Sequence, residues 1–590
     1  MILNSLLKNT RLMCLAGFLG ITLPQMTAAP IEHIGDRYIM HVSEMELTGE
    51  ESLLDVLMMC PEVISLDGNN IIGGDPFANQ YGKFVIRIDN QEYGLDYATL
   101  LHHFKAREIE SIKVCQNAEV MKGCSSLKKV IDITLRKGEN GVSGRAGLFG
   151  DTYGGGKGIV SVLSQQDDLR ILSHVEGNFQ RTSNSDKDAY QNQSSNTINH
   201  YSHEGAKLNV LWTPTSKDIL EVDAMQTYTR NHFTHSPAEY VRAYHLQADY
   251  TRTLGENGSS ILFTLGAEHI SDNGRTQEES QTFPYQNHST YPFAVVEYAT
   301  PVFTKDLWIT AGFEGGLSIE KNCIADYINH SNYEDFYVQL DYNIGKWGFM
   351  AGERYRIINF RPKQISSVSN WKHTTHNHIY SFSTYYTFTP GHTLQGTFCR
   401  RIFNPEFGDF VTAGDMEGAW KPTYTTDIRN SLANVMELKY TYSKPNLVVS
   451  TSVKNIHQHL IDNDNTLGIG TTAFWHTGIL RLTAGFNYFW ERAETPVEET
   501  SLRDTSYHNF AVFKLAPQLT LPDGWRLTSN LIWCTYRHTA TPAYTPANLY
   551  AEVGVYKNIG KHLTLEGRFH DIASQHFGNR AATIGCTYYF

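Results

Sequence analysis

The sequence predicts a transmembrane antiparallel β-barrel of about 22 strands, preceded by a small α+β domain. Three observations predict this fold: runs of alternating apolar and polar residues, an alternation of tight and long connections between those runs, and an aromatic C-terminus. Aromatic residues make up 12% of the 590 residues, yet the mean hydropathy is −0.35. Beyond the N-terminus no run of roughly 18 apolar residues occurs, so a membrane role must come from strands, whose two faces cancel in an average hydropathy.

The N-terminus has the features of a secretory signal. Lys8 and Arg11 precede an apolar stretch at residues 12–23, and the small residues Ala28 and Ala29 follow it. This order predicts a signal peptide over residues 1–29 that is cleaved near its end. The sequence is therefore divided into a signal peptide (1–29), the α+β domain (30–141) and the barrel (142–590), with the mature chain in the outer membrane of a Gram-negative bacterium.

Cysteine spacing and charge exclude several classes of protein. The cysteines after residue 29 are scattered without a CxxC pair, which argues against a zinc site and a disulfide scaffold. Cys115 and Cys124 are close enough in sequence to form a disulfide in an oxidising periplasm, and two separate thiols are an equal alternative. The formal net charge of −12 disfavours a nucleic-acid partner, which needs concentrated Lys and Arg.

Alternation within the runs after residue 142 predicts the barrel wall. In residues 307–319 one face carries Leu307, Phe313 and Leu317, while the opposite face carries Thr310 and Glu314. The first face would contact lipid. Residues 479–490 and 525–537 alternate in the same way, with Arg481 and Arg526 on their polar faces. Aromatic residues gather at the end of the first of these runs, as an interfacial girdle would require.

The connections between the runs alternate in length. Tight connections are predicted at residues 215–218, 343–346, 390–392, 443–446 and 522–524. Longer polar loops are predicted near residues 181–200, 272–287, 361–375, 404–428 and 492–505. Short turns on one side and long loops on the other are typical of the periplasmic and extracellular ends of a bacterial barrel, which has an even number of strands.

The C-terminal run ends at Phe590, on the same face as Ile584, Cys586 and Tyr588. This ending resembles that of bacterial outer-membrane barrels. The resemblance implies that Phe590 belongs to the signal that the barrel-insertion machinery recognises.

The segment before the barrel has a different sequence pattern. Helix-like stretches at residues 52–59 and 96–104 alternate with apolar strands at residues 84–89, 109–114 and 130–135. This mixture predicts a small α+β domain that is too polar to be part of the barrel wall.

Motifs in this segment resemble the plug domain of TonB-dependent receptors. Leu54-Asp55-Val56-Leu57 followed by Cys60-Pro61-Glu62-Val63 resembles the plug signature LDVL..LPGV. Residues 85–89, 107–114 and 130–138 resemble the strands that follow in that plug, and residues 35–38 are similar to the segment ahead of the plug in Bacteroidetes-type receptors. The resemblance covers residues 35–138, with a plug expected inside or beneath the barrel.

The resemblance implies a receptor that binds a ligand at extracellular loops and imports it when the TonB complex rearranges the plug. An alternative from another class is a non-transporting barrel that serves as an anchor or docks a partner such as a surface lipoprotein. No recognisable TonB box lies between the mature N-terminus and Glu51, which favours the alternative. The sequence does not identify the ligand.

Enzymatic chemistry is not expected, and no cofactor is predicted. No Ser-His-Asp order, HExxH or GxSxG motif is present. His457 and His459 share one face of a predicted strand and are candidate metal ligands, with a solvated or headgroup-facing pair as the alternative. His373, His376 and His378 fall in a predicted loop, where imidazoles are ordinary surface residues.

Overall fold

The computed structural model describes most of the chain after residue 30. In the N-terminal part it describes residues 31–34, 37–45, 47, 49, 51–60, 63–64, 72–73, 84–88, 91–92, 100–101, 104–115 and 129–136. From residue 141 onward it describes everything except residues 153, 188–193, 234–235, 279–280, 323–326, 365–371, 404–410, 414–421, 425–430, 445, 460–462, 497–502, 536, 539–543, 546–547, 561, 571 and 573–580. The predicted signal peptide lies outside the described residues.

The N-terminal domain, called the plug below, is built on a six-stranded sheet in the order β1-β2-β7-β8-β5-β6. Strands β5 and β8 are parallel and the other neighbours are antiparallel. The sheet strands are β1 (Ile31–Ile34), β2 (Arg37–Met40), β5 (Phe84–Ile88), β6 (Gln91–Glu92), β7 (Ile109–Cys115) and β8 (Lys129–Leu135). The other elements of the domain are α2 (Leu53–Leu57), the pair β3 (Val63–Ile64) and β4 (Ile72–Gly73), and the 3-10 helix η2 (Ala106–Glu108). An α+β domain was predicted, and its strands confirm that prediction.

Helix α2 begins at a capping box. The Ser52 hydroxyl accepts from the backbone N–H of Asp55 at 3.2 Å, and the Asp55 carboxylate accepts from the backbone N–H of Ser52 at 3.0 Å. These bonds satisfy N–H groups that a helix start leaves without partners. The helix then packs Leu53 and Leu57, both fully buried, into the apolar core of the plug.

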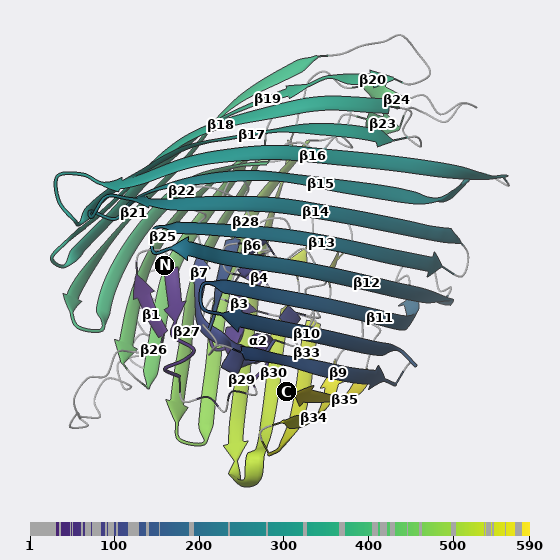
Figure 1. Cartoon of the computed structure of the whole chain (residues 1–590). Coiled ribbons are helices and arrows are strands. Elements are labelled where there is room, and N and C mark those ends of the chain that lie inside the picture. Colours follow the sequence, from purple (N-terminus) through teal and green to yellow (C-terminus); the bar gives the residue numbers. More distant parts are fainter. Residues whose placement is uncertain are drawn as a thin grey trace.

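A closed antiparallel barrel surrounds the plug (Figure 1). Within the described residues 22 strands close the wall, counting β20 as the continuation of β19, because both pair with β18 in one register. The predicted strand number is confirmed. The wall strands are β9 (Gly141–Asp151), β10 (Gly156–Gln166), β11 (Leu169–Lys187), β12 (Ser194–Thr215), β13 (Asp218–Phe233), β14 (Ser236–Leu254), β15 (Ser259–Glu278), β16 (Gln281–Pro301), β17 (Leu307–Asn322), β18 (Tyr327–Ile344), β19 (Trp347–Phe360), β20 (Pro362–Gln364), β21 (His373–Thr389), β22 (His392–Phe403), β25 (Ser431–Lys444), β26 (Leu447–His459), β27 (Asn463–Thr477), β28 (Leu480–Pro496), β29 (Arg503–Leu521), β30 (Trp525–Cys534), β33 (Asn548–Ile559), β34 (Leu563–His570) and β35 (Ala581–Tyr589).

The two faces of the wall differ as the alternation predicted. On β17, Phe313 and Leu317 point outward and are 37% and 51% exposed, whereas Glu314 points inward and is 8% exposed. The outward face carries a belt of large apolar side chains, with Trp490 and Trp533 on two further strands. A contiguous apolar belt around a closed barrel is stable only against lipid.

The tight connections are confirmed, including the 3-10 turn η4 (Pro522–Gly524) between β29 and β30. Several predicted long loops are wrong, because the strands continue through the polar sequence. Strands β11 and β12 pair up to Lys187 opposite Ser194, and β15 and β16 pair up to Glu278 opposite Gln281. Backbone pairing needs no apolar side chain, so polarity marks where lipid ends and not where a strand ends. The short pairs β23 (Val411–Ala413) with β24 (Pro422–Tyr424) and β31 (Arg537–His538) with β32 (Tyr544–Thr545) stand apart from the wall sheet.

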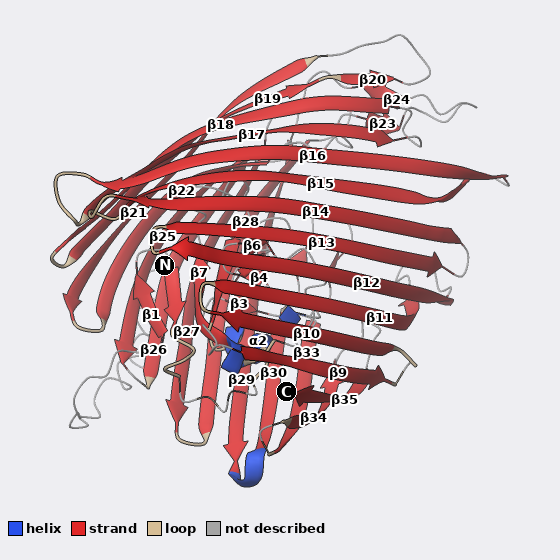
Figure 2. Cartoon of the chain, in the orientation of Figure 1, coloured by secondary structure: helices blue, strands red, loops and turns tan. Residues whose placement is uncertain are grey.

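The barrel closes between its first and last strands. Strand β35 pairs with β9, and the backbone of Phe590 exchanges hydrogen bonds of 2.9 and 3.0 Å with Gly144. A Cβ on Gly144 would lie 2.5 Å from the Phe590 ring, so glycine is needed at this close approach. Strand predominates throughout the molecule (Figure 2). None of the described helices has the length and apolar character of a membrane span.

Candidate functional site: the interface between plug and barrel

The plug meets the barrel through charged side chains around the start of α2. The opposing wall is formed by strands near the C-terminus, β28 to β34, which pass beside α2 (Figure 1). The residues of this ionic network are Glu51, Asp55 and Lys105 on the plug, and Arg481, Arg526, Glu552, Glu566 and Arg568 on the barrel. They form one connected set of buried charges.

Glu51 is the first anchor of the network. Its side chain is fully buried, and its Oε1 atom lies 3.7 Å from a guanidinium nitrogen of Arg481 and 3.7 Å from one of Arg526. The same oxygen accepts from Nε2 of Gln518 at 3.3 Å. Three neighbouring strands, β28, β29 and β30, therefore converge on one carboxylate that precedes the helix.

Asp55 is the second anchor, one helical turn further along. Its Oδ2 atom lies 3.6 Å from Arg526 and 3.9 Å from Arg568. Arg568 also donates to the Ser52 hydroxyl at 3.2 Å and pairs with Glu552 at 3.1 Å. The capping box that starts α2 is thus the same structure that presents the plug to the barrel.

A buried tyrosine lies at the centre of the barrel side of the network. The Tyr556 ring lies 4.1 Å from the Arg526 guanidinium, 5.1 Å from that of Arg568 and 6.0 Å from the Lys105 ammonium. Cations over an aromatic face are attracted by its quadrupole, most strongly when they are removed from water. The ring therefore helps to hold three like charges together.

Lys105 lies directly before η2 of the plug, and its side chain extends into the ionic network. Its ammonium lies 3.6 Å from Glu566. Burial lowers the pKa of Lys105, and the neighbouring Glu566 carboxylate opposes this shift. The plug therefore carries one cation that is expensive to keep charged at the interface.

A separate ion pair, outside the ionic network, lies near the barrel seam. Arg145 of β9 is fully buried and contacts Glu108 of η2 at 2.7 Å, with its guanidinium 4.5 Å from the Phe104 ring. The Arg107 guanidinium lies 3.3 Å from the Tyr589 ring. The plug is thus held at both the start and the end of the wall sheet.

The end of α2 is held by a different kind of contact. Lys514 of β29 donates from Nζ to three backbone carbonyls of the plug, those of Met58, Cys60 and Val63. Carbonyls at a helix C-terminus carry partial negative charge and attract a cation. The helix therefore meets arginines at its acidic start and a lysine at its end.

Apolar side chains of the wall also contact the plug. Val448 and Phe474 of the barrel belong to the apolar core of the plug, and Leu172, Met225 and Ala516 pack against it. The Tyr38 hydroxyl bonds to that of Ser450 at 2.8 Å. Charged, polar and apolar contacts therefore all join the plug to the barrel.

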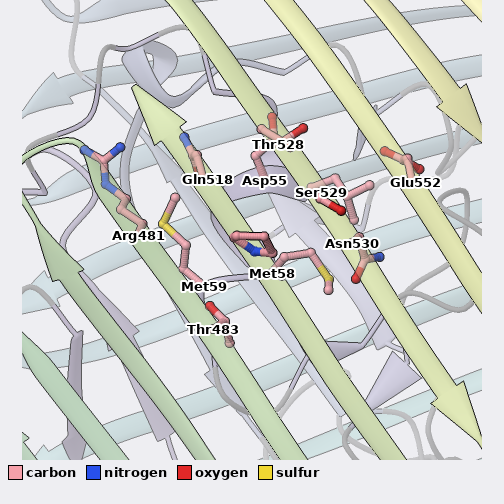
Figure 3. Close-up of a pocket in the computed structure, with 13 residues that line it drawn as sticks. Asp55, Met58, Met59, Arg481, Thr483, Gln518, Thr528, Ser529, Asn530 and Glu552 are labelled. Atoms are coloured by element: carbon pink, nitrogen blue, oxygen red, sulfur yellow. The ribbon is translucent and has the colours of Figure 1, made fainter. Parts of the chain in front are cut away.

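A small cavity lies beside the ionic network (Figure 3). Its volume is about 30 Å³, and its lining includes Asp55, Met58, Arg481, Asn530 and Glu552. A space of this size with polar lining is large enough for a water molecule. A water molecule in this cavity would lie beside Asp55 on the charged side of α2.

The arrangement fixes the position of the plug in the barrel. Buried ion pairs repay their desolvation cost only in good geometry, so they fix one register without adding much net stability. Removal of one partner leaves a charge buried alone, which is costly.

The predicted site residues lie away from this interface. His457 is on β26, half-buried, and the His459 side chain lies outside the described residues. No cluster of three metal-ligating side chains occurs in the described part of the chain. The metal pair therefore stays a prediction. His373, His376 and His378 were predicted in a loop, but they lie on β21, because the strand extends into polar sequence.

Two other predictions concern the chain ends and the cysteines. Cys115 is buried at the end of β7, and Cys124 lies outside the described residues, so the disulfide stays a prediction. Phe590 points outward beside the barrel seam, 49% exposed. Its role in barrel assembly also stays a prediction.

Sequence reasoning missed the ionic network, although a signal was present. Arg481 and Arg526 were placed on the polar face of their strands, which is the face that meets the plug. Charged residues on a lumen face predict a polar partner inside the barrel. Nothing in the sequence paired them with Glu51 and Asp55, which lie more than 400 positions away.

Comparison with known proteins identifies the fold. No family model and no curated protein matches the sequence. Solved structures match along almost the whole chain. The ferric-catecholate import receptor Fiu of Escherichia coli K12, in a closed form, has a TM-score of 0.68 at 11% identity, covering 96% of this chain and 99% of that one.

Two further structures give the same result. A variant of the ferric enterobactin receptor PfeA of Pseudomonas aeruginosa has a TM-score of 0.68 at 11% identity, covering 94% of this chain and 98% of that one. The siderophore receptor PirA of Acinetobacter baumannii has a TM-score of 0.67 at 12% identity, covering 94% and 98%. The chain therefore has the fold of the outer-membrane siderophore receptors, a closed barrel of 22 strands around a plug.

Proposed function

We propose that the protein is an outer-membrane receptor that imports a ligand through its barrel, with release of the plug driven by the TonB complex. The observation that carries the proposal is a folded plug held inside a closed 22-strand barrel by buried ion pairs. Barrels of this size enclose a lumen that needs a plug.

The likeness to siderophore receptors makes a ferric siderophore the first ligand class to test. Those neighbours are receptors for transport, which also supports a non-enzymatic role. We further propose that residues 1–29 are a signal peptide and that the plug extends to residue 141, where the first wall strand begins.

The test combines binding with uptake. Full-length protein is immobilised, and binding of a TonB C-terminal domain is measured with and without a ferric catecholate. Uptake of the radiolabelled ferric catecholate is then measured in cells with and without the TonB complex. We expect binding to TonB and uptake that disappears without it.

A different pattern of results would overturn the proposal. If TonB does not bind and uptake is the same in both strains, coupled import fails. If a surface lipoprotein copurifies in addition, the protein is a docking subunit, which was the alternative from the sequence.

A further inference from the structure

We infer that the outer face of the barrel carries a binding site for the phosphorylated headgroup of an outer-leaflet glycolipid. The site consists of Tyr228 and Arg230 on β13 and Tyr240 and Arg242 on β14, here called the Arg–Tyr ladder. This inference requires only that the barrel lies in the outer membrane, and it is independent of transport.

The four side chains form a stack across two neighbouring strands. Tyr228 lies opposite Arg242, and Arg230 lies opposite Tyr240. The Arg242 guanidinium lies 5.4 Å from the Tyr228 ring, and that of Arg230 lies 5.6 Å from the Tyr240 ring. The two tyrosine rings stack on each other at 6.4 Å. The tyrosines thus separate two guanidiniums and hold each one in place.

The ladder faces outward. On β13 the alternate residues Asp223 and Thr227 are buried toward the lumen, and on β14 Gln247 and Asp249 are also buried there. The ladder residues lie at the even-numbered positions of these strands, whose side chains point to the outer face of the wall. Both arginines of the ladder are exposed. Anything that binds them must therefore approach from the membrane side of the wall.

The ladder also lies at the edge of the lipid belt. Along β14 the next outward residues toward the tight turns are Tyr244 and Leu246, which are 42% and 57% exposed. Tyr244 stacks on His269 of the neighbouring strand at 6.4 Å. Aromatic rings of this kind mark the level of the headgroups. Because the connection between β13 and β14 is at the end opposite the tight turns, the ladder lies on the extracellular side.

Within the described residues, no carboxylate neutralises either ladder arginine. The described residues provide each guanidinium with a tyrosine ring and with no ion pair to a carboxylate. By contrast, Arg252 at the other end of β14 pairs with Asp218 at 3.6 Å. Two exposed guanidiniums on a chain with a net charge of −12 form a local site of approach for an anion.

A phosphorylated glycolipid fits both the cationic ladder and the apolar surface next to it. Guanidinium groups bind phosphate oxygens in a bidentate geometry, and tyrosine hydroxyls can donate to the same group. Acyl chains of the same molecule would lie on Leu246 and Tyr244 below the ladder. Exposed Glu204, which lies opposite Tyr228 on β12, is the charge that opposes binding.

Native mass spectrometry of the full-length protein in detergent tests the inference. The probes are lipid A with two phosphates and the same lipid A without phosphates. We expect the wild type to retain the phosphorylated form selectively. The double variant Arg230→Gln with Arg242→Gln should retain roughly tenfold to thirtyfold less of it. Glu204→Gln should increase retention.

Arg252→Gln is the matched control, since it removes an exposed arginine from the same strand and should leave retention unchanged. Heat-dependent electrophoretic mobility confirms that each variant keeps a folded barrel. Equal retention of the two lipids, or equal loss in the Arg252 control, would overturn the inference. Displacement of lipid A by millimolar inorganic phosphate would assign the site to free anions instead.

Discussion

Within the plug sheet, Ile112, Ile131 and Ile133 are fully buried in an apolar core, whereas the surface of the same domain that faces the barrel presents Glu51 and Asp55 to arginines. Apolar burial is collective and non-directional, so a core of this kind folds once and stays folded. Buried ion pairs depend on geometry and are costly when one partner is lost. The apolar core therefore determines the stability of the plug fold, whereas the ion pairs contribute to its attachment to the barrel.

The contrast is not complete at every contact. Val448 and Phe474 of the wall belong to the same apolar cluster as the plug core. They lie on β26 and β27, and β27 is paired with β28, the strand that carries Arg481. Attachment is therefore ionic around α2 and partly apolar on neighbouring strands of the wall.

The largest effect is expected from a charge placed in the plug core. Ile131→Asp buries a carboxylate without a partner and should lower the free energy of unfolding of the plug by more than about 4 kcal/mol. The plug should become sensitive to protease while the barrel keeps its heat-dependent mobility. Thr134→Asp, at an exposed position of the same strand, is the control and should have little effect. Protease resistance in the Ile131 variant would contradict the role assigned to the core.

Removal of one ionic partner should detach the plug without unfolding it. Arg568→Met leaves Asp55, Glu552 and Glu566 with less compensation and should weaken plug docking by about 3–5 kcal/mol. Urea titration with protease cleavage of the plug as the readout measures this change. Arg252→Met, which removes an exposed surface pair, should shift the midpoint by far less. Equal midpoints in the two variants would mean that the ionic network does not hold the plug.

Loss of a single neutral hydrogen bond should be smaller still. Tyr38→Phe removes the bond to Ser450 while the ring stays buried, and the Ser450 hydroxyl keeps a second partner, Thr441, at 3.0 Å. The same urea titration should show a loss of about 1 kcal/mol. A loss as large as that of Arg568→Met would show that the polar contacts near β2 matter as much as the ionic network.

A change of pH should alter plug docking through the buried Lys105. Because the pKa of Lys105 is lower in the docked plug than its ordinary value of 10.5, the docked state disfavours the proton. The resulting cost is fully present below the lowered pKa and disappears as the pH rises toward 10.5. Docking should therefore tighten between neutral and alkaline pH, and Lys105→Met should remove this dependence. Glu566 opposes the shift in the pKa of Lys105, whereas Arg526 and Arg568 add to it. A slope of the opposite sign would contradict it.

Much of the fold could be predicted because the two faces of the barrel wall are in different environments. Lipid on one side and a polar lumen on the other impose a period of two on every strand, as on β17, where Phe313 and Glu314 take opposite faces. The same pattern could not predict strand ends. Residues 181–187 and 194–200 are polar, yet they pair as strands above the lipid belt.

The candidate site could be predicted only in part. Arg481 and Arg526 were assigned to the polar face correctly, and Asp55 was noticed within the plug motif. Their pairing could not follow from sequence, because a carboxylate at the start of a helix is also typical of a simple cap.

The sequence by itself determined the class of wall, its strand number and the presence of a plug, since these depend on local periodicity and motifs. Only the tertiary structure decided how the plug is held. Closure of the barrel between β9 and β35 brings the last strands around α2, and Arg568 and Asp55 meet there although they are far apart in the chain. Long-range pairing of charges depends on that closure and leaves no periodic trace in the sequence.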